Sequence, residues 1–297
     1  MDFGKLTDIE GVDFSLPPEP VRTRALLERA GRPPEVPWLV LGAPAWARRD
    51  WIGKLYPAGA SPRDLLRHYA RVCGAIELNA SYYTVPDEHV LDAWAAETPP
   101  DFRFCPKLHR GITHDAPLVQ GVAAAAEFGR RLRRLGDRLG PFLVQLPPWF
   151  TPAELPALDA VLGALDGPAH VEFRHAELFR KGVLHPAAAD LCERRGAGVV
   201  ITDVAGRRDV CHATLTAPEL MLRFVGNGLH PSDFTRVDAW LARLVDWRSR
   251  GLRRVYFFVH QPDDHVAPEL LQGLRERAAA RGIPVHTPRA RGQLSLL

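Results

Sequence analysis

The sequence lacks the features that mark secreted, membrane-spanning and zinc-binding proteins. It has only four cysteines in 297 residues, and none of them forms a Cys-x-x-Cys pair. We therefore expect free thiols in a reducing cytosol rather than disulfides or a zinc site. No apolar run approaches the roughly 18 residues needed to span a bilayer. Residues 1–5 lack a basic region followed by an apolar core, which predicts a cytoplasmic protein without a signal peptide.

A strong charge imbalance is also missing. The 38 basic and 35 acidic residues leave a net charge of +3, so the composition does not indicate a general nucleic-acid binder. Any basic surface would have to be local. Hydrophobic residues make up 46% and charged residues 25% of the chain, which is the ordinary composition of a globular protein.

Short apolar segments alternate with helical segments along most of the chain. We expect strands at 38–42, 75–79, 102–107, 142–146, 171–174, 198–203, 220–224 and 254–260. We expect helices at 61–73, 86–96, 118–135, 151–165, 186–195, 232–250 and 268–281, with a long connection at 204–218 in place of one helix. This alternation predicts an α/β fold, namely a single (β/α)8 TIM-type barrel. An open doubly wound sheet is the alternative, but no glycine-rich phosphate turn follows the first strand.

Two segments flank the expected barrel domain of residues 37–286. Residues 1–36 are rich in proline and charge, with a short helix expected at 22–30, and predict an arm or strap over the barrel. Residues 287–297 predict a flexible C-terminal tail, in which a Pro/Arg/Gly linker leads to a final pentapeptide.

Most of the expected strands carry a polar side chain at or near the C-terminal end. These side chains are Glu77, Asn79, Lys107, Gln145, Glu172, Arg174, Asp203, Arg223 and His260. In a barrel the strand ends converge on one mouth, where active sites are built. An isolated buried charge costs several kcal/mol, so three acids and three bases brought together there must pair with one another or hold a ligand.

Two interpretations of this set stay open. In the first, the charges form a self-satisfied network of ion pairs. In the second, the basic side chains hold a phosphate or carboxylate, which the planar fork of arginine binds well. The substrate-binding candidates are then Arg174, Lys107, Arg223, Asn79, Gln145, Tyr82, Trp46 and His175. The candidates for proton transfer or other catalysis are Glu172, Glu77, Asp203 and His260.

A divalent metal is a less favoured cofactor. The carboxylates and histidines at the strand ends have suitable ligand chemistry. However, no HxH, HExxH or DxD spacing occurs, and the basic residues at the mouth oppose a cation. Aromatic residues that follow the first two strands, Trp46 and Tyr82 among them, are expected either to wall the mouth or to pack at its rim.

Several motifs in order along the chain resemble the YecE-like family, a domain of unknown function with the number 72. The matching stretches are Trp-Ile-Gly-Lys-Leu-Tyr-Pro at 51–57, Glu-Leu-Asn-Ala-Ser-Tyr-Tyr at 77–83, Phe-Cys-Pro-Lys at 104–107 with Ile-Thr-His at 112–114, Gln-Leu-Pro-Pro-Trp-Phe at 145–150 and Val-Glu-Phe-Arg-His at 171–175. The resemblance covers about residues 37–285 and implies a TIM-type barrel, but no established reaction. Where many members have paired asparagines after a phenylalanine in the eighth strand, this chain has Phe-Val-His-Gln-Pro at 258–262, so any role of those asparagines does not carry over.

The C-terminal pentapeptide resembles the peptide with which bacterial replication and repair proteins bind the DNA sliding clamp. Gln293 can hydrogen-bond at the edge of a groove, and Leu294, Leu296 and Leu297 can fill apolar pockets. The alternative is a tail that is frayed or that packs against its own barrel.

These observations support three hypotheses of function. The first is a hydrolase that handles an anionic substrate and is linked to DNA repair through the tail. The second is a barrel enzyme, an isomerase or hydrolase, acting on a small phosphorylated or carboxylated metabolite. The third is a non-catalytic protein that binds a ligand or nucleic acid. The expected partners are accordingly a small anionic ligand or nucleic acid, with the sliding clamp as a further partner.

Overall fold

Eight parallel strands form the centre of the protein. The computed structural model describes residues 4–289. The eight strands are β1 (Leu39–Gly42), β2 (Ala75–Leu78), β3 (Arg103–Pro106), β4 (Phe142–Gln145), β5 (Ala169–Glu172), β8 (Gly198–Asp203), β9 (Glu219–Val225) and β10 (Arg254–His260). Six of them form one parallel sheet in the order β1-β10-β9-β8-β5-β4, and β2 pairs with β3 in a separate parallel ladder. The expected α/β fold with a mostly parallel sheet is therefore confirmed.

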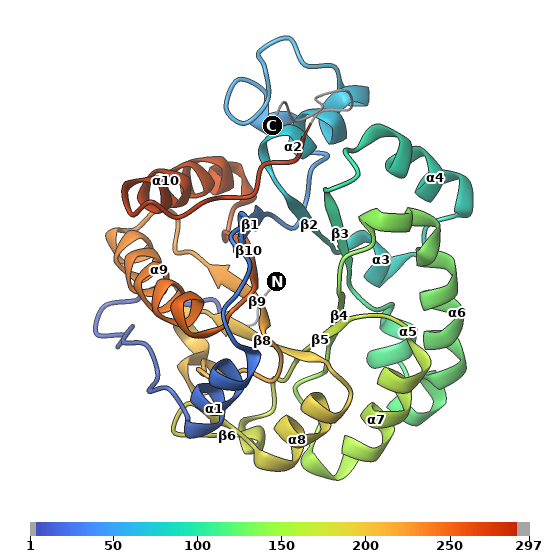
Figure 1. Ribbon diagram of the computed structural model, residues 1–297. Coiled ribbons are helices and arrows are strands. Elements are labelled where there is room, and N and C mark those ends of the chain that lie inside the picture. The colour runs from blue at the N-terminus through green and yellow to red at the C-terminus, as the bar shows by residue number, and fades with distance from the viewer. Residues whose placement is uncertain (1–3, 290–297) are drawn as a thin grey trace.

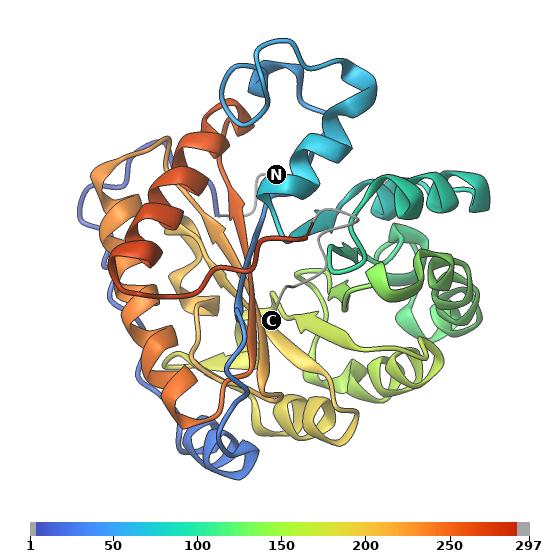
Figure 2. The same ribbon diagram turned by 45° about the horizontal axis from the view of Figure 1, so that its top comes forward.

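The two sheets meet at two seams with sparse backbone pairing. On one side, isolated bridges join Phe104 to Leu139 and Lys107 to Leu143, next to β3 and β4. On the other side, backbone N–H groups of Gly74 and Glu77 donate to carbonyl groups at the end of β1. The views along and oblique to the strands show them grouped around a common axis, with the helices outside (Figures 1 and 2). At both seams the described residues are joined by isolated bridges and single backbone hydrogen bonds, not by a continuous β-ladder.

The helices cover the outer surface of the strands. They are α1 (Val21–Ala30), α2 (Leu65–Val72), α3 (Ala80–Tyr83), α4 (Glu88–Glu97), α5 (Arg110–Thr113), α6 (Val122–Leu132), α7 (Leu155–Ala164), α8 (Pro186–Arg194), α9 (Pro231–Arg250) and α10 (Ala267–Ala280). The longest of these, α9, shows why such segments are helical. Proline occupies its first turn, and Gly251 ends it with a φ of 137°. Its buried residues Val237, Trp240, Leu241 and Leu244 recur at spacings of three and four, which places them on one face.

Apolar residues of seven of these strands form a cluster of their own. A larger core lies between the strands and the helices. The inner cluster consists of Val40, Ala75, Cys105, Leu143, Val200, Met221, Tyr256 and Phe258. These residues come from β1, β2, β3, β4, β8, β9 and β10, so strands on both sides of each seam contribute to one interior. All four cysteines are buried and free, as expected.

Three segments differ from the sequence-based expectation. The fifth strand ends at Glu172, so Arg174 lies beyond it, where His175 accepts from the backbone of the following turn. The helix expected at 118–135 is divided into a 3-10 turn at Leu118–Gly121, α6, and a second 3-10 segment at Arg133–Arg138, in which Gly136 has a φ of 56°. A small hairpin of β6 (Phe179–Arg180) and β7 (Val183–Leu184) was not expected. Both central residues of its turn, Lys181 and Gly182, have positive φ values. A Lys-Gly pair predicts such a turn less clearly than Asn-Gly does.

The N-terminal segment of residues 4–20 runs along the β8, β9 and α9 side of the molecule. Gly206 N–H donates to the carbonyl of Gly4 at 2.9 Å. The Phe14 ring lies 4.7 Å from the guanidinium of Arg236, and Glu19 accepts from the indole N–H of Trp247 at 2.6 Å. These contacts hold the arm near the strand ends.

Candidate functional site at the strand ends

A layer of polar side chains lies next to the apolar inner cluster, toward the carboxyl ends of the strands. Side chains two residues apart on a strand point to the same side. The inner residues Ala75, Cys105, Leu143, Met221 and Phe258 are therefore followed, two positions later, by Glu77, Lys107, Gln145, Arg223 and His260. All five of these polar side chains are buried. The same alternation that builds the core thus delivers ionisable groups to the carboxyl ends of the strands.

Glu77 is the most heavily hydrogen-bonded carboxylate of this layer. It accepts two bonds of 2.9 Å from Arg223, one of 2.8 Å from Asn79 Nδ2, and one of 3.0 Å from His260 Nε2. Its side chain is fully buried. Burial alone would raise the pKa of Glu77, but the charge of Arg223 and the hydrogen bond with His260 hold it well below its ordinary value.

Glu172 is the second buried carboxylate. Its Oε2 accepts from Arg223 Nη1 at 2.9 Å and from Gln145 Nε2 at 2.8 Å, and its Oε1 accepts from Arg174 Nε at 2.8 Å. Burial would raise the pKa of Glu172, but Arg174 and Arg223 lower it to about 2. Both glutamates are therefore ionised at neutral pH, where they are weak proton acceptors. The ion-pair network that the sequence left open as an alternative is present around these two side chains.

Lys107 is the cation that this network does not neutralise. Its side chain is 5% exposed, and its Nζ lies 4.0 Å from the centre of the Tyr82 ring. Within residues 4–289 no carboxylate lies within 4.0 Å of that ammonium group, as the ion pairs of Glu77 and Glu172 go to the two arginines. Burial and then the charge of Arg223 lower the pKa of Lys107 to about 8. In the described part of the chain, two carboxylates therefore face the three cations Lys107, Arg174 and Arg223.

An aromatic rim adjoins Lys107. His114 lies edge-to-face with Tyr82 at 5.2 Å and with Trp149 at 6.0 Å between ring centres. Burial, together with the charges of Lys107 and Arg174, lowers the pKa of His114 to about 4, so the ring is neutral at pH 7. Trp149 is 59% exposed, and a cavity of about 340 Å³ lies between it and the loop that carries His114. The candidate residues from the sequence included neither His114 nor Trp149. The short sequence motifs that follow the third and fourth strands, and that contain His114 and Trp149, could have pointed to these two residues.

Three expected site residues do not join the cluster. Val200 belongs to the inner cluster, so Thr202 points inward and Asp203 points toward α9. There Asp203 accepts from Arg236 Nη1 at 3.0 Å and Trp240 Nε1 at 2.6 Å, and it also pairs with Arg208. His175 accepts from the backbone of Glu177, and Trp46 packs against Trp94 and Phe104. Asp203 thus anchors α9, His175 caps a turn, and Trp46 belongs to the core.

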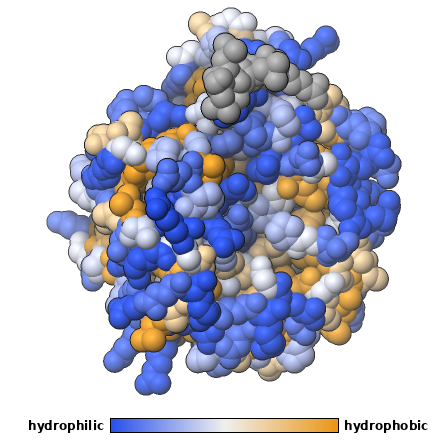
Figure 3. Space-filling model, in the orientation of Figure 1, coloured by the Kyte–Doolittle hydropathy of each residue, from blue (hydrophilic) through white to orange (hydrophobic). Residues whose placement is uncertain are grey.

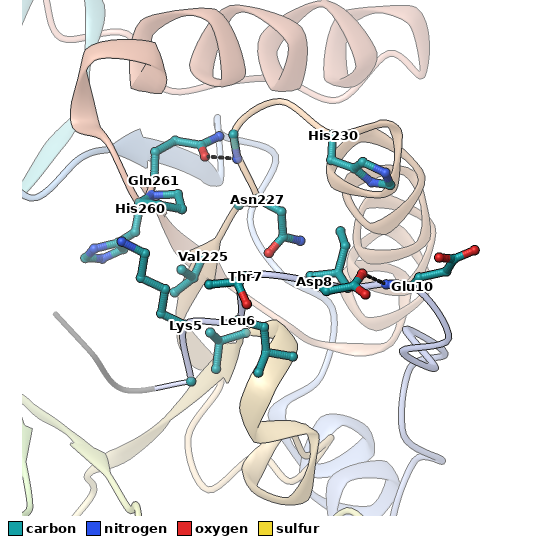
Figure 4. A pocket seen from close by; sticks show the side chains of 16 residues that line it. Lys5, Leu6, Thr7, Asp8, Glu10, Val225, Asn227, His230, His260 and Gln261 are labelled. Atoms are coloured by element: carbon teal, nitrogen blue, oxygen red, sulfur yellow. Dashed lines mark hydrogen bonds between the residues drawn. The ribbon is translucent and has the colours of Figure 1, made fainter.

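A larger cavity opens on the opposite side of the mouth. It has a volume of about 760 Å³ and lies beside His260, between the arm and the ends of β8, β9 and β10 (Figure 4). The face of the molecule that Figure 3 shows is largely hydrophilic, with smaller hydrophobic areas. Within residues 4–289 no three His, Cys, Asp or Glu side chains are grouped so that they could hold a metal ion. Across the same described range, every helix is too short or too polar to cross a membrane.

Comparison with known proteins identifies the family. The UPF0759 protein YecE of Escherichia coli K12 is 33% identical over 258 residues, which cover 80% of this chain and 92% of that protein. The UPF0759 protein YunF of Bacillus subtilis is 27% identical over 118 residues, 38% of this chain and 41% of that protein. A DUF72 family protein of Enterococcus faecalis with a known crystal structure has a TM-score of 0.65 at 16% identity, and the match covers 86% of this chain and all of that one. That likeness supports the fold alone.

The family described as "Protein of unknown function DUF72" matches residues 40–293. This match, together with the relatives named YecE, confirms the resemblance drawn from the sequence motifs. The chain belongs to the DUF72 family.

Proposed function

We propose that this protein binds a small anionic ligand, bearing a phosphate or a carboxylate, at the carboxyl ends of its strands. The observation that carries the proposal is the buried ammonium group of Lys107, which has no carboxylate within 4.0 Å among residues 4–289. A buried charge without a partner is costly, and an anion would provide that partner. Arg174, beyond the end of β5, and Tyr82 border the same position and complete the proposed binding site.

We infer that the strands form a TIM-type barrel around this site. The inner apolar cluster draws on strands from both sides of each sparse seam, as expected for a closed ring. In this arrangement Arg223, Gln145 and Asn79 hold Glu77 and Glu172 in place. Lys107, with a pKa of about 8, is the group of the cluster best suited to exchange a proton near neutral pH. Catalytic roles for Glu172, Glu77, Asp203 and His260 stay predictions.

The ligand is expected to bind only while Lys107 is protonated. Sulfate is the best probe because its own charge does not change between pH 6.5 and 9.5. We expect its affinity to be constant below pH 8 and to fall by up to about tenfold per pH unit above it. Calorimetric titration of the wild type and of Lys107→Met measures this, and the variant should show weak, pH-independent binding. Lys54→Met, which removes a surface lysine paired with Glu269, is the matched control and should behave as the wild type. Constant wild-type affinity over the whole range would refute the proposal.

The arm favours a small ligand over duplex DNA. Residues 4–10 line the cavity at one side of the mouth, so part of the mouth is already covered. This supports the hypothesis of a small-metabolite enzyme or ligand-binding protein more than that of a hydrolase acting directly on duplex DNA.

We further propose that the C-terminal tail binds the DNA sliding clamp. Gln293, Leu294, Leu296 and Leu297 lie outside the described residues, so the proposal rests on their sequence. Deleting residues 293–297 should abolish capture of the protein by immobilised bacterial sliding clamp, with the melting temperature unchanged within about 1 °C. Ser295→Ala leaves the proposed anchors in place and should be captured normally. If the intact protein is not captured, the clamp proposal fails while the anion site is unaffected.

A further inference from the structure

The aromatic rim beside Lys107 includes a fourth ring, that of Tyr83. Tyr83 lies edge-to-face with Tyr82, with 5.0 Å between the ring centres. From Tyr82 the rim continues through His114 to Trp149. The two tyrosines end α3 after β2, His114 follows α5 after β3, and Trp149 follows β4. Three successive loops on the carboxyl side of the strands thus place their aromatic residues in one row.

Two rings of this row are exposed to a degree that no other aromatic side chain of the described chain shares. Tyr83 is 68% exposed and Trp149 is 59% exposed. Every other Phe, Trp and Tyr of residues 4–289 is buried or half-buried. Large aromatic side chains normally lie in the core, so exposed rings that gather in one place indicate a binding surface.

The rings of the rim are held in place by polar contacts behind them. His114 Nδ1 lies 2.7 Å from Thr113 Oγ1, and Thr113 is buried. His109 Nε2 lies 3.2 Å from the carbonyl oxygen of Tyr83. A surface that is ordered before binding loses little conformational freedom when a ligand stacks on it.

The cavity beside Trp149 indicates what kind of ligand part fits there. Its volume of about 340 Å³ is suitable for part of a small molecule, and Leu118 and Pro147 supply apolar walls. Asp115 and Glu154 supply carboxylates at its edge. A flat apolar group can stack on the indole, and N–H donors at its rim can bond to the free lone pairs of these carboxylates. Nucleobases combine a flat face with such donors.

The aromatic rim reaches the proposed anion site through Tyr82. Lys107 Nζ lies 4.0 Å from the centre of the Tyr82 ring, and that ring lies 5.2 Å from His114. Within residues 4–289 Lys107 Nζ makes no hydrogen bond, yet it is not among the unpaired side-chain atoms that are fully enclosed. The ammonium group therefore keeps some accessible surface beside the rim. An anion at Lys107 and a ring stacked on the rim can belong to one molecule of the size of a nucleotide.

We propose that the aromatic rim binds the base of a nucleotide whose phosphate lies at Lys107. The proposal rests on the proposed anion site and assigns its ligand to the class of nucleoside monophosphates. Trp149 and His114 stack on the base, and Asp115 and Glu154 accept from its amino or imino groups. The negative charge of these two carboxylates also keeps the phosphate out of the cavity and at the lysine.

The test compares inorganic phosphate, ribose 5-phosphate, adenosine and the 5′-monophosphates of adenosine, guanosine, cytidine and uridine at pH 7 by calorimetry. We expect at least one nucleoside monophosphate to bind the wild type at least about ten times more tightly than ribose 5-phosphate, since stacking adds to the affinity. Trp149→Ala should lose this advantage and still bind ribose 5-phosphate within about twofold of the wild type. Val119→Ala removes a side chain that is 60% exposed and lies outside the row of rings, so it should bind as the wild type does.

A spectroscopic measurement distinguishes direct stacking from a structural role of Trp149. A base stacked on an indole quenches its fluorescence, so the nucleotide should lower the emission of the wild type in a saturable way. Trp149→Phe keeps a ring at this position and should retain most of the affinity while it loses most of the quenching. The difference between the two proteins isolates Trp149 from the other six tryptophans. Equal quenching in both would contradict stacking on Trp149.

The possible failures of the two proposals give different results. If Lys107→Met binds inorganic phosphate and ribose 5-phosphate as well as the wild type does, the anion site itself is wrong. If these ligands depend on Lys107 but no nucleotide binds more tightly, the base site is wrong and the anion site stands. The base site is also wrong if Trp149→Ala keeps the advantage, because the base is then held elsewhere. If a short single-stranded oligonucleotide binds far more tightly than every mononucleotide, the assignment to single nucleotides is wrong.

Discussion

Replacing Lys107 with methionine should stabilise the folded protein at neutral pH while it removes anion binding. Burial lowers the pKa of Lys107 from an ordinary value near 10.5 to about 8. The unfolded chain therefore binds this proton more tightly than the folded protein does. Methionine fills a similar volume without the charge. A shift of this size corresponds to a gain in the free energy of unfolding of about 3 kcal/mol at pH 7.

The dependence of this gain on pH has a definite sign. Between about pH 8 and 10.5 the folded protein has lost the proton of Lys107 while the unfolded chain still holds it. Wild-type stability therefore rises with pH through this window, and the advantage of Lys107→Met shrinks over it. Urea denaturation at pH 7 and at pH 9.5 measures both effects, with Lys54→Met as the control that should change little. A clear loss of stability in Lys107→Met at pH 7 would contradict the expectation, since it would mean that the ammonium group is already neutralised in the folded state.

Replacing Arg223 with methionine should have the opposite and larger effect. Arg223 is 1% exposed and bonds to both Glu77 and Glu172. Its removal leaves two buried carboxylates with less compensation, and breaking such a pair by deleting one partner costs about 3–5 kcal/mol. We expect the free energy of unfolding to fall by that amount in urea denaturation at pH 7.

A double variant separates the loss of the ion pair from the loss of packing. Adding Glu77→Gln to Arg223→Met removes one of the stranded charges, so part of the lost stability should return. Arg32→Met removes an arginine from a fully solvated pair with Glu35, whose side chains are 85% and 84% exposed, and should change stability by less than about 1 kcal/mol. If the double variant is less stable than Arg223→Met, the two side chains do not depend on each other as the hydrogen bonds indicate.

The alternation of strands and helices was predictable from the sequence, and so was the polar layer. The segments 198–203 and 254–260 coincide with β8 and β10, because each is a continuous apolar run with clear ends. Glu77, Gln145 and Glu172 stand two residues after an inward-facing position, and the period of two in a strand brings them together. The family resemblance and the parallel sheet followed from the same local patterns.

The direction of Asp203 was not predictable in this way. Gly-Val-Val-Ile-Thr-Asp is apolar on both faces, since the strand is covered by the interior on one side and by helices on the other. The sequence pattern therefore does not show which residues of this strand face the interior. The pairing with β9, in which Thr202 lies beside Arg223, decides that Thr202 and not Asp203 faces inward. Because Asp203 was expected in the cluster, the excess of cations over carboxylates among its described residues was not apparent from the sequence. The sequence suggested three acids against three bases, and with Asp203 turned toward α9 two acids remain.

The sparse seams on both sides of the β2–β3 ladder have a mechanical consequence for the mouth. The sector that carries Lys107 and Tyr82 is tied to its neighbours by a few backbone bonds, whereas Arg223 and His260 stand on strands with long, continuous pairing. We therefore expect the side that carries Lys107 and Tyr82 to deform more easily than the side that carries Arg223 and His260. Under the proposed function, this side would adjust to ligands of different size while Glu77 and Glu172 stay in place.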